Sequence, residues 1–409
     1  MKILHTSDWH IGRMLYGRKR YSEYEEFLVW LADLIRSQHV DALLVSGDIF
    51  DNSAPSNRAQ ELYYRFLYRI AESSCRHVVI IAGNHDSPSF IDAPKQLLGS
   101  LNVHVVGTIT ESLINEVLVL KDGFGVEELI VCAIPYLRDR DIRTAEAGET
   151  TEDKDKKLID GIRSHYLEVC ELARLQKAAL DHPVPIIAMG HLFTTGAQTV
   201  EGDGVRELYI GSLSHVDTDV FPEYINYVAL GHLHVPQIIG HSDIVRYSGS
   251  PLPMGFGEAN HDKSICLMEM SDSTPVVTRI TVPRFQTLER ICGNLDQIAT
   301  RLGELKSTGS NAWIEIFYEG EEVAGNLREH IDEAVAETKM EVLRVKNNRI
   351  IERALSSAHE DEELVDLDAN DVFLRCLDQH AIPEDQRNEL LSAYKEIVTS
   401  LHEEDTMAE

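Results

Sequence analysis

Five short apolar runs in this chain each end beside a small residue, and side chains able to bind metal ions follow at once. The runs are Lys2–Thr6, Ala42–Ser46, Val78–Ala82, Pro185–Met189 and Tyr227–Leu230. Their length and their content of Val, Ile and Leu are typical of buried strands. Ligands gather at the carboxyl ends of strands in an α/β sheet, and glycine permits close approach there. The pattern therefore predicts one crowded polar cluster at a sheet edge.

The five strand ends carry seven side chains with nitrogen or oxygen donors: Asp8, His10, Asp48, Asn84, His191, His232 and His234. Seven such donors are too many for one ion and suit two, with positions left for water and substrate. A set without thiolates favours Mn²⁺, Fe²⁺ or Zn²⁺ over a structural zinc. Two ions about 4 Å apart stabilise the attacking and leaving oxygens of a displacement at phosphorus. A single motif of this kind arises by chance, but five in order predict a dinuclear centre.

Helical patterns lie between the strands of the first 280 or so residues. Apolar side chains recur at three- and four-residue spacing in Tyr21–Ser37, Leu62–Ile70 and Leu158–Leu180, and further strand patterns occur at Val103–Val106 and Leu129–Ile134. This alternation predicts an α/β domain over residues 1–281 with a largely covered sheet.

The pattern of predicted helices and strands changes from about Val282. Helix patterns at 297–305 and 326–337 and strand patterns at 312–318 and 340–345 predict a small α+β unit over residues 282–348. An acidic linker is expected at 349–368 and a helical hairpin at 369–409. Two helices cannot bury the whole apolar stripe of this hairpin, so it either binds a partner or docks on the main domain.

The composition limits what the chain can be. An apolar fraction of 43% with 26% charged residues rules out wholesale disorder. No apolar run approaches the roughly 18–20 residues that cross a bilayer, and the N-terminus becomes polar too soon for a secretory signal. The six cysteines are scattered and contain no C-x-x-C pair. We therefore expect a cytoplasmic protein with reduced thiols and no membrane segment.

The formal charge of −30, taken by itself, argues against a polyanion as ligand. Residues 350–409 hold 17 acidic and 4 basic side chains, and so account for −13 of this charge. Two divalent ions would invert the sign of the charge where a phosphate must lie. The charge therefore argues against tight binding of nucleic acid by the chain alone, and not against chemistry on nucleic acid.

The five motifs resemble a known signature. Asp8-x-His10, Gly47-Asp48-x-x-Asp51, Gly83-Asn84-His85-Asp86, Gly190-His191 and Gly231-His232-x-His234 are similar to those of calcineurin-like metallophosphoesterases. In local detail, residues 5–10, 133–138 and 246–251 resemble the SbcD family of bacterial nuclease subunits. The resemblance is strong over about residues 1–280. In the remainder of the chain only the order of the predicted segments is similar. It implies a four-layer α/β/β/α sandwich with a capping domain that positions DNA.

The same resemblance assigns roles to the site residues. One ion would be held by Asp8, His10, Asp48 and His234, and the other by Asp48, Asn84, His191 and His232. His85 would stabilise the pentavalent phosphorus or protonate the leaving oxygen, with Asp86 orienting it. Asp51 is expected to hold a ligand histidine or the backbone turn. The implied activity is a Mn²⁺-dependent double-strand exonuclease and single-strand endonuclease in DNA repair and recombination.

The sequence does not decide the roles of two groups of basic residues. Phosphate contact and a solvated loop are equally good interpretations of the cluster Arg13, Arg18, Lys19 and Arg20. The same alternatives apply to Arg138, Arg140 and Arg143, whose field is weakened by Asp139 and Asp141.

Three classes of function compete: a DNA nuclease, a phosphoesterase for small molecules or proteins, and a silent scaffold. The complete ligand set with His85 argues against a scaffold. Related phosphomonoesterases commonly carry Arg-Gly where this chain has Asn52-Ser53, which favours a diester by analogy.

Partners follow from the resemblance alone. It implies an SMC-like ATPase, SbcC, as partner, and the absence of any Gly-Lys dipeptide leaves ATP binding to that partner. It also implies a nucleoid-associated heterotetramer that contains a homodimer of this chain, with Glu61–Ile70 as a candidate dimer helix.

Overall fold

The computed structural model describes residues 1–143, 149–197, 216–240, 243–271, 274–320 and 327–347, and the single positions 377, 387 and 394. The chain divides into two compact units, Met1–Thr287 and Leu288–Glu409. This division falls a few residues after the boundary predicted at 281/282. The predicted acidic linker, and the predicted hairpin apart from those three positions, lie outside the described residues.

The first unit is built on two six-stranded sheets. In spatial order, the first sheet contains β14 (Thr274–Thr281), β13 (Ser264–Ser271), β1 (Lys2–Thr6), β4 (Ala42–Ser46), β5 (His77–Ile81) and β6 (Val103–Val106). The second contains β11 (Gln237–Ile238), β12 (Val245–Tyr247), β10 (Tyr227–Gly231), β9 (Ile186–His191), β8 (Glu127–Ala133) and β7 (Val117–Lys121). The strands β1, β4, β5 and β6 are mutually parallel, as are β8, β9, β10 and β12, so their carboxyl ends share one edge in each sheet.

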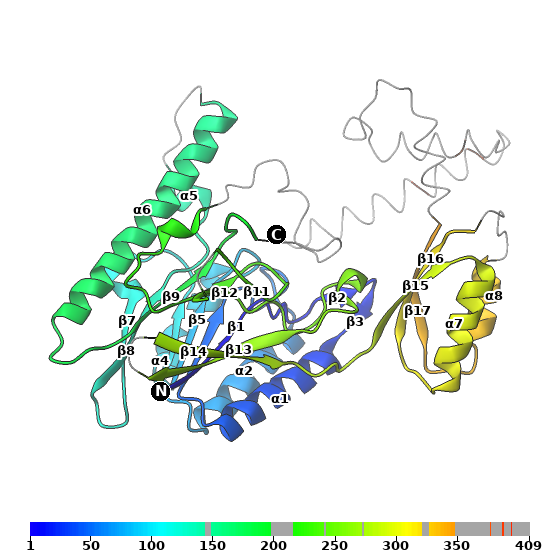
Figure 1. Cartoon of the computed structure of the whole chain (residues 1–409), viewed down its shortest axis with the longest axis horizontal. Coiled ribbons are helices and arrows are strands. Elements are labelled where there is room, and N and C mark those ends of the chain that lie inside the picture. The colour runs from blue at the N-terminus through cyan, green and yellow to red at the C-terminus, as the bar shows by residue number, and fades with distance from the viewer. Residues whose placement is uncertain are drawn as a thin grey trace. The chain divides into compact units, whose positions relative to one another are not determined.

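Helices cover the outer faces of the two sheets. The helices α1 (Tyr21–Gln38) and α2 (Asn57–Ala71) pack on the first sheet, and α6 (Thr151–Ala178) packs on the second. Figure 1 shows α1 and α2 (blue) on one side of the paired sheets and α6 (green) on the other. Alternate residues of β4 explain the layering, because Leu43 and Val45 pack with the helices while Ala42 and Leu44 pack between the sheets. The result is the predicted four-layer α/β/β/α sandwich.

Local sequence accounts for the ends of these helices. The Ser56 side chain accepts a hydrogen bond from the backbone N–H of Ala59 at the start of α2, and Thr150 and Asp153 form a capping box on α6. The helix α1 ends at Gln38, and the next residue, His39, adopts a left-handed conformation with φ of 54°.

Shorter elements connect the layers. The hairpin of β2 (Met14–Leu15) and β3 (Arg18–Lys19) follows β1. The remaining α-helices are α3 (Pro88–Asp92), α4 (Lys95–Gly99) and α5 (Asp139–Ile142), and 3₁₀ turns occur at Leu113–Glu116, Thr218–Val220 and Phe256–Glu258. Within the described ranges, none of the helices combines the length and the apolar character needed to span a bilayer.

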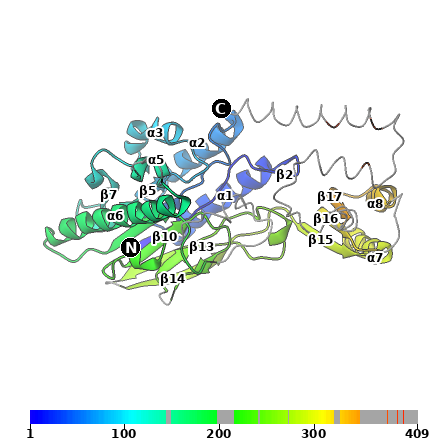
Figure 2. The ribbon, with the colours of Figure 1, turned by 90° about the horizontal axis from the view of Figure 1, so that it is seen from above.

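The second unit contains a three-stranded parallel sheet in the order β15 (Leu288–Gly293), β16 (Trp313–Tyr318) and β17 (Glu341–Asn347). The helices α7 (Leu295–Ser307) and α8 (Leu327–Val335) connect the strands and bury Ile298, Leu302 and Ile331 against them. Figure 2 shows the two helices beside the three strands. Sequence analysis predicted both helices and the last two strands, but missed β15. Because strands and helices alternate and the sheet is parallel, this unit has an α/β arrangement and not the predicted α+β arrangement.

Candidate metal centre

The turns after β1 and β4 lie side by side and continue the pairing of the two strands. The backbone N–H of Asp8 donates to the carbonyl of Gly47 at 3.0 Å, and that of His10 donates to the carbonyl of Asp48 at 3.0 Å. Asp8, His10 and Asp48 all have φ near +50°, and φ of His232 is 102°. Four of the seven predicted ligands therefore hold conformations that non-glycine residues rarely adopt, which is typical of a functional site.

The side chain of Trp9 anchors the first turn on the helix side of the sheet. Its ring lies edge-on to Phe27 and Phe66, with centroid distances of 6.0 and 5.4 Å, and its Nε1–H donates to Thr6 Oγ1. The tryptophan is fully buried. Its packing fixes the backbone that carries Asp8 and His10.

Glycines allow neighbouring strand ends to meet, both within the first sheet and between the two sheets. A Cβ atom on Gly231 would lie 1.8 Å from the carbonyl oxygen of Ser46, and one on Gly83 would lie 2.1 Å from Oδ1 of Asp48. On Gly47, it would lie 2.3 Å from Nδ1 of His191. The glycines predicted to permit close approach are thus required for it.

One group of donors joins the end of β1 to the end of β10. The Nε2 atoms of His10 and His234 lie 3.1 Å apart, and ligand atoms of both lie within 4.8 Å of a carboxylate oxygen of Asp8. Oδ2 of Asp48 lies 3.6 Å from Nε2 of His10. The four residues predicted to hold the first ion are therefore brought together.

A second group lies on the other side of Asp48. Its Oδ2 lies 3.3 Å from Nε2 of His191, and Oδ1 of Asn84 lies 3.0 Å from that nitrogen and 2.9 Å from Nδ1 of His232. The Nδ1–H of His191 donates to the carbonyl of Ser46 at 2.9 Å, which directs Nε2 toward Asp48 and Asn84. Asp48 contacts both groups, and a carboxylate oxygen of Asp8 also lies within 4.8 Å of ligand atoms of Asp48 and His191.

The donor set fits divalent metal ions. Imidazole nitrogens lie about 2.1 Å from a first-row metal, so two of them at a right angle on one ion are about 3 Å apart, as His10 and His234 are. Without a cation the site retains protons instead. Burial raises the pKa of Asp8 to about 7, and Asp48 raises the pKa of His191 to about 9 although burial alone would lower it. A bound cation would supply the positive charge that these protons supply here.

The residues His85 and Asp51 lie beside the first group. The backbone N–H of His85 donates to Oδ1 of Asp48 at 2.9 Å, and its Nδ1 lies 2.8 Å from the carbonyl oxygen of Asp51. The Asp51 carboxylate lies 3.4 Å from Nδ1 of His10 and accepts from Arg13 at 3.2 Å. Burial alone would raise the pKa of Asp51, but His10 and Arg13 keep it below its usual value. Asp51 thus contacts the outer nitrogen of a predicted ligand.

The position of Asp86 differs from our expectation. Its carboxylate accepts hydrogen bonds from the backbone N–H groups of Ile49, Phe50 and Gly83, at 2.9 to 3.1 Å. The His85 ring is held by the Asp51 carbonyl instead. The expectation that Asp86 orients His85 directly was wrong, because the carboxylate satisfies three buried amides of the adjoining turns. Asp86 fixes the turns that carry Asp48 and His85.

The predicted basic cluster is divided by the fold. Arg20 is almost completely buried, forms a two-pronged ion pair with Glu23 at 2.8 Å, and donates to the carbonyl of Pro253 at 2.6 Å. Its interpretation as a substrate contact was wrong, because its guanidinium is buried and donates its hydrogen bonds to groups inside the protein. Arg18 and Lys19 are exposed on β3, and Arg13 contacts Asp51. These three residues remain candidates for phosphate contact.

Comparison with known proteins agrees with this geometry. Residues 1–236 match the calcineurin-like phosphoesterase family, and residues 284–381 match the SbcD_C family, whose description is Type 5 capsule protein repressor C-terminal domain. The SbcD subunit of the SbcCD nuclease from Escherichia coli (strain K12) is 34% identical over an alignment of 409 positions that covers 98% of each chain. The chain belongs to the SbcD family. The SbcD proteins of Rhodobacter capsulatus and Bacillus subtilis are 36% and 33% identical over 277 and 272 residues, covering 66% of this chain and 67% and 66% of theirs.

As a member of the SbcD family with a calcineurin-like phosphoesterase domain, the chain is a metal-dependent phosphoesterase that uses divalent metal ions. The family signature lies in the same strand ends that the structure brings together.

Sequence reasoning missed a buried ion pair behind His234. The ammonium of Lys263 lies 2.7 Å from Glu258 and donates to Ser250 Oγ at 2.9 Å and to the carbonyl oxygen of His234 at 3.0 Å. Lys263 is only 4% exposed. It therefore fixes the backbone of a predicted ligand. No local pattern distinguishes this lysine, since its partners come from three other positions in the chain.

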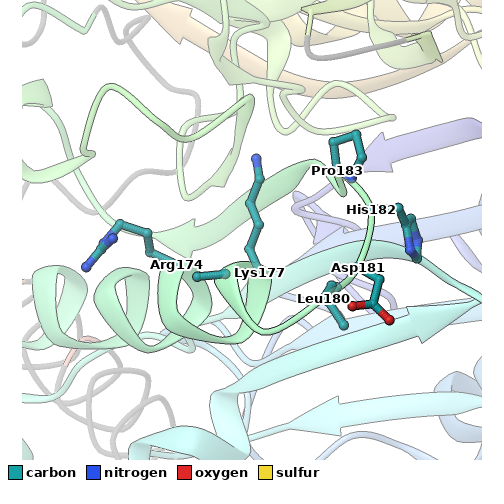
Figure 3. A pocket seen from close by; sticks show the side chains of 7 residues that line it. Arg174, Lys177, Leu180, Asp181, His182 and Pro183 are labelled. Carbon is teal, nitrogen blue, oxygen red and sulfur yellow. The ribbon is translucent and has the colours of Figure 1, made fainter.

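A pocket of about 470 Å³ lies elsewhere, at the C-terminal end of α6. Arg174, Lys177 and His182 line it among others, and Figure 3 shows their side chains around the turn that leads toward β9. The pocket shares no residue with the metal centre.

Proposed function

We propose that this chain is a Mn²⁺-dependent DNA nuclease that combines double-strand 3′–5′ exonuclease with single-strand endonuclease activity. The observation that carries the proposal is the position of His85 against Asp48, at the edge of the clustered nitrogen and oxygen donors. The family relationship over 98% of the chain supports DNA as the substrate.

The donors divide into two overlapping sets. Asp8, His10, Asp48 and His234 would hold one ion, and Asp48, Asn84, His191 and His232 would hold the other. When bound, the ions would make a water acidic enough to release a proton to solvent at neutral pH, and would supply positive charge to offset the charge that develops on phosphorus.

Side chains of the protein perform the remaining steps of the reaction. His85 keeps Nδ1 against the Asp51 carbonyl, which leaves Nε2 for the substrate. In the imidazolium form, Nε2–H donates to the leaving oxygen while the phosphorus–oxygen bond to it breaks and a new bond to the water oxygen forms. The products are a phosphate monoester and an alcohol. Asp51 and Asp86 hold the ring and the turns in place.

A degradation assay tests this function. We expect the purified chain with Mn²⁺ to cleave linear DNA, with the rate on duplex ends increased by its ATPase partner. The nuclease proposal fails if the chain hydrolyses only phosphomonoesters or cyclic nucleotides with every metal tested.

The partner proposal has its own experiment. In this proposal the chain works with an SMC-like ATPase, SbcC, in DNA repair and recombination, as a homodimer within a heterotetramer. Residues 369–409 dock on the ATPase, and residues 282–348 position DNA. Deletion of residues 369–409 should abolish association with SbcC in a pull-down, and undiminished association would disprove the docking role.

A further inference from the structure

The segment that follows β8 runs along the turn that carries Asn84 and His85. The backbone N–H of Tyr136 donates to the carbonyl of Ala82 at 2.9 Å, and its ring lies edge-on to His191 with a centroid distance of 6.1 Å. Two residues later, the Nη2–H of Arg138 donates to the carbonyl oxygen of Asp86 at 3.0 Å. The Arg138 guanidinium is thus hydrogen-bonded to Asp86, the residue that directly follows His85.

Four other arginines near this edge have carboxylate partners. Arg13 pairs with Asp51 at 3.2 Å and Arg140 with Asp141 at 3.6 Å. Arg143 contacts both Asp139 and Glu149, and Arg20 is buried against Glu23.

Arg138 differs from them in its partner. Within the described part of the chain, its one hydrogen-bond partner is the neutral Asp86 carbonyl, and it forms no ion pair. Arg138 is half-buried, so its guanidinium is partly accessible to a ligand. One of its five N–H donors is used, and the others retain the planar geometry that matches two phosphate oxygens.

We propose that Arg138 binds a phosphate of the nucleic-acid strand beside His85, an inference that rests on the proposed nuclease function. The Asp86 carbonyl fixes the guanidinium at the turn of the catalytic histidine, so the positive charge is available where a polyanion must approach a strongly acidic chain. Charge-assisted, two-pronged contact with phosphate is the interaction that arginine makes best. The alternatives left open by the sequence are thereby separated: Arg138 contacts substrate, while Arg140 and Arg143 belong to local ion pairs.

The test compares Arg138→Gln with Arg140→Gln, a matched change two residues away. Steady-state cleavage of linear DNA with Mn²⁺ is measured over a range of salt concentrations. We expect Arg138→Gln to raise KM by about 10- to 100-fold, and to reduce the slope of log KM against log salt by about one. Arg140→Gln should stay within about twofold of the parent chain, and Arg138→Lys should recover most of the salt slope because it keeps the charge.

Two further readouts separate substrate contact from a structural role. Metal content and the midpoint of thermal unfolding should be unchanged in Arg138→Gln. Bis(4-nitrophenyl) phosphate has only one phosphate, so a parallel loss on this diester assigns Arg138 to the scissile phosphate, and a loss on DNA alone assigns it to a neighbouring one. An unchanged KM and salt slope on DNA would overturn the proposal, as would loss of metal. If the parent chain cleaves no DNA, the nuclease function itself fails, which is a different result.

Discussion

The Nε2 atoms of His10 and His234 face each other at 3.1 Å, although 224 positions separate the two residues in the chain. His10 follows β1 of the first sheet, and His234 follows β10 of the second. Two imidazoles from different sheets converge in this way where both can contribute a lone pair to one cation. Their contact joins the two halves of the sandwich at the metal centre.

Replacement of His234 tests this convergence. We expect His234→Ala to weaken binding of one ion by more than the roughly 10- to 100-fold that loss of an outer hydrogen-bond partner costs. The second group, around Asn84 and His191, keeps its donors, so metal content should fall from two ions per chain to about one. Isothermal titration with Mn²⁺ measures this, and His261→Ala, at an exposed position, is the control. Retention of both ions at full affinity would contradict the assignment.

Replacement of His85 separates catalysis from metal binding. His85→Ala removes the group that stabilises the developing charge or protonates the leaving oxygen, and we expect turnover to fall by about 10²- to 10⁴-fold. Metal content should persist, because the ring is held by a backbone carbonyl and not by the predicted ligand atoms. Elemental analysis of the purified variant measures its metal content, and a DNA cleavage assay measures its turnover. A variant that lost both ions would show that His85 is itself a ligand.

Replacement of Gly231 probes the approach of the two sheets. A Cβ at this position would lie 1.8 Å from the Ser46 carbonyl oxygen, so the strand ends must move apart. We expect Gly231→Ala to lower the free energy of unfolding by about 1–3 kcal/mol and to abolish metal binding. Gly303→Ala is the matched control, since a Cβ there meets nothing within 4 Å and helix α7 should gain up to about 1 kcal/mol. Urea denaturation compares the two, and equal stability would disprove the steric argument.

Replacement of Lys263 tests the support behind His234. Lys263→Met leaves the buried Glu258 carboxylate without its cation, so the double variant with Glu258→Gln isolates the positioning role. We expect the double variant to fold and to bind Mn²⁺ about 10-fold more weakly, because the His234 backbone loses its fixed donor. Metal titration measures the affinity, with Lys121→Met at an exposed position as the control. An unchanged affinity would limit the ion pair to a structural role.

Metal removal should change how stability depends on pH. In the metal-free chain the pKa of His191 is about 9, above the value of about 6.5 that an unfolded histidine has. The folded state therefore binds the proton more tightly, and its contribution to stability is complete below about pH 6.5 and lost as pH rises toward 9. Burial raises the pKa of Asp8 from about 3.8 to about 7, so its contribution to stability is complete below about pH 3.8 and is lost as pH rises through about 7.

Urea denaturation with EDTA, at about pH 6.5 and about pH 8.5, should show lower stability at the higher pH. Saturating Mn²⁺ should reverse the trend, because the ion binds the deprotonated donors. His191→Gln should remove most of the decrease seen with EDTA. A metal-free chain that became more stable at the higher pH would contradict the proposed charge state.

Local pattern determined much of this protein. The bounds predicted for β1, β4 and β6 agree with the structure, because runs of branched apolar residues closed by glycine or acidic residues specify strands without reference to distant segments. The strand-end motifs predicted side chains that the structure does bring together. A parallel sheet places such ends along one edge, so this clustering could be predicted from position alone.

Tertiary structure decided what the individual charges do. The strand β13 pairs with β1 across the chain, as in Lys2 opposite Glu269, and no local periodicity specifies that partner. Arg20 comes after β1 and Arg138 after β8, yet one is buried against Glu23 and the other reaches the turn of His85. A charged side chain is neutralised or left available by the groups that folding brings near it. Sequence spacing does not encode those groups, and so the clustering of the strand-end donors was predictable while their surroundings were not.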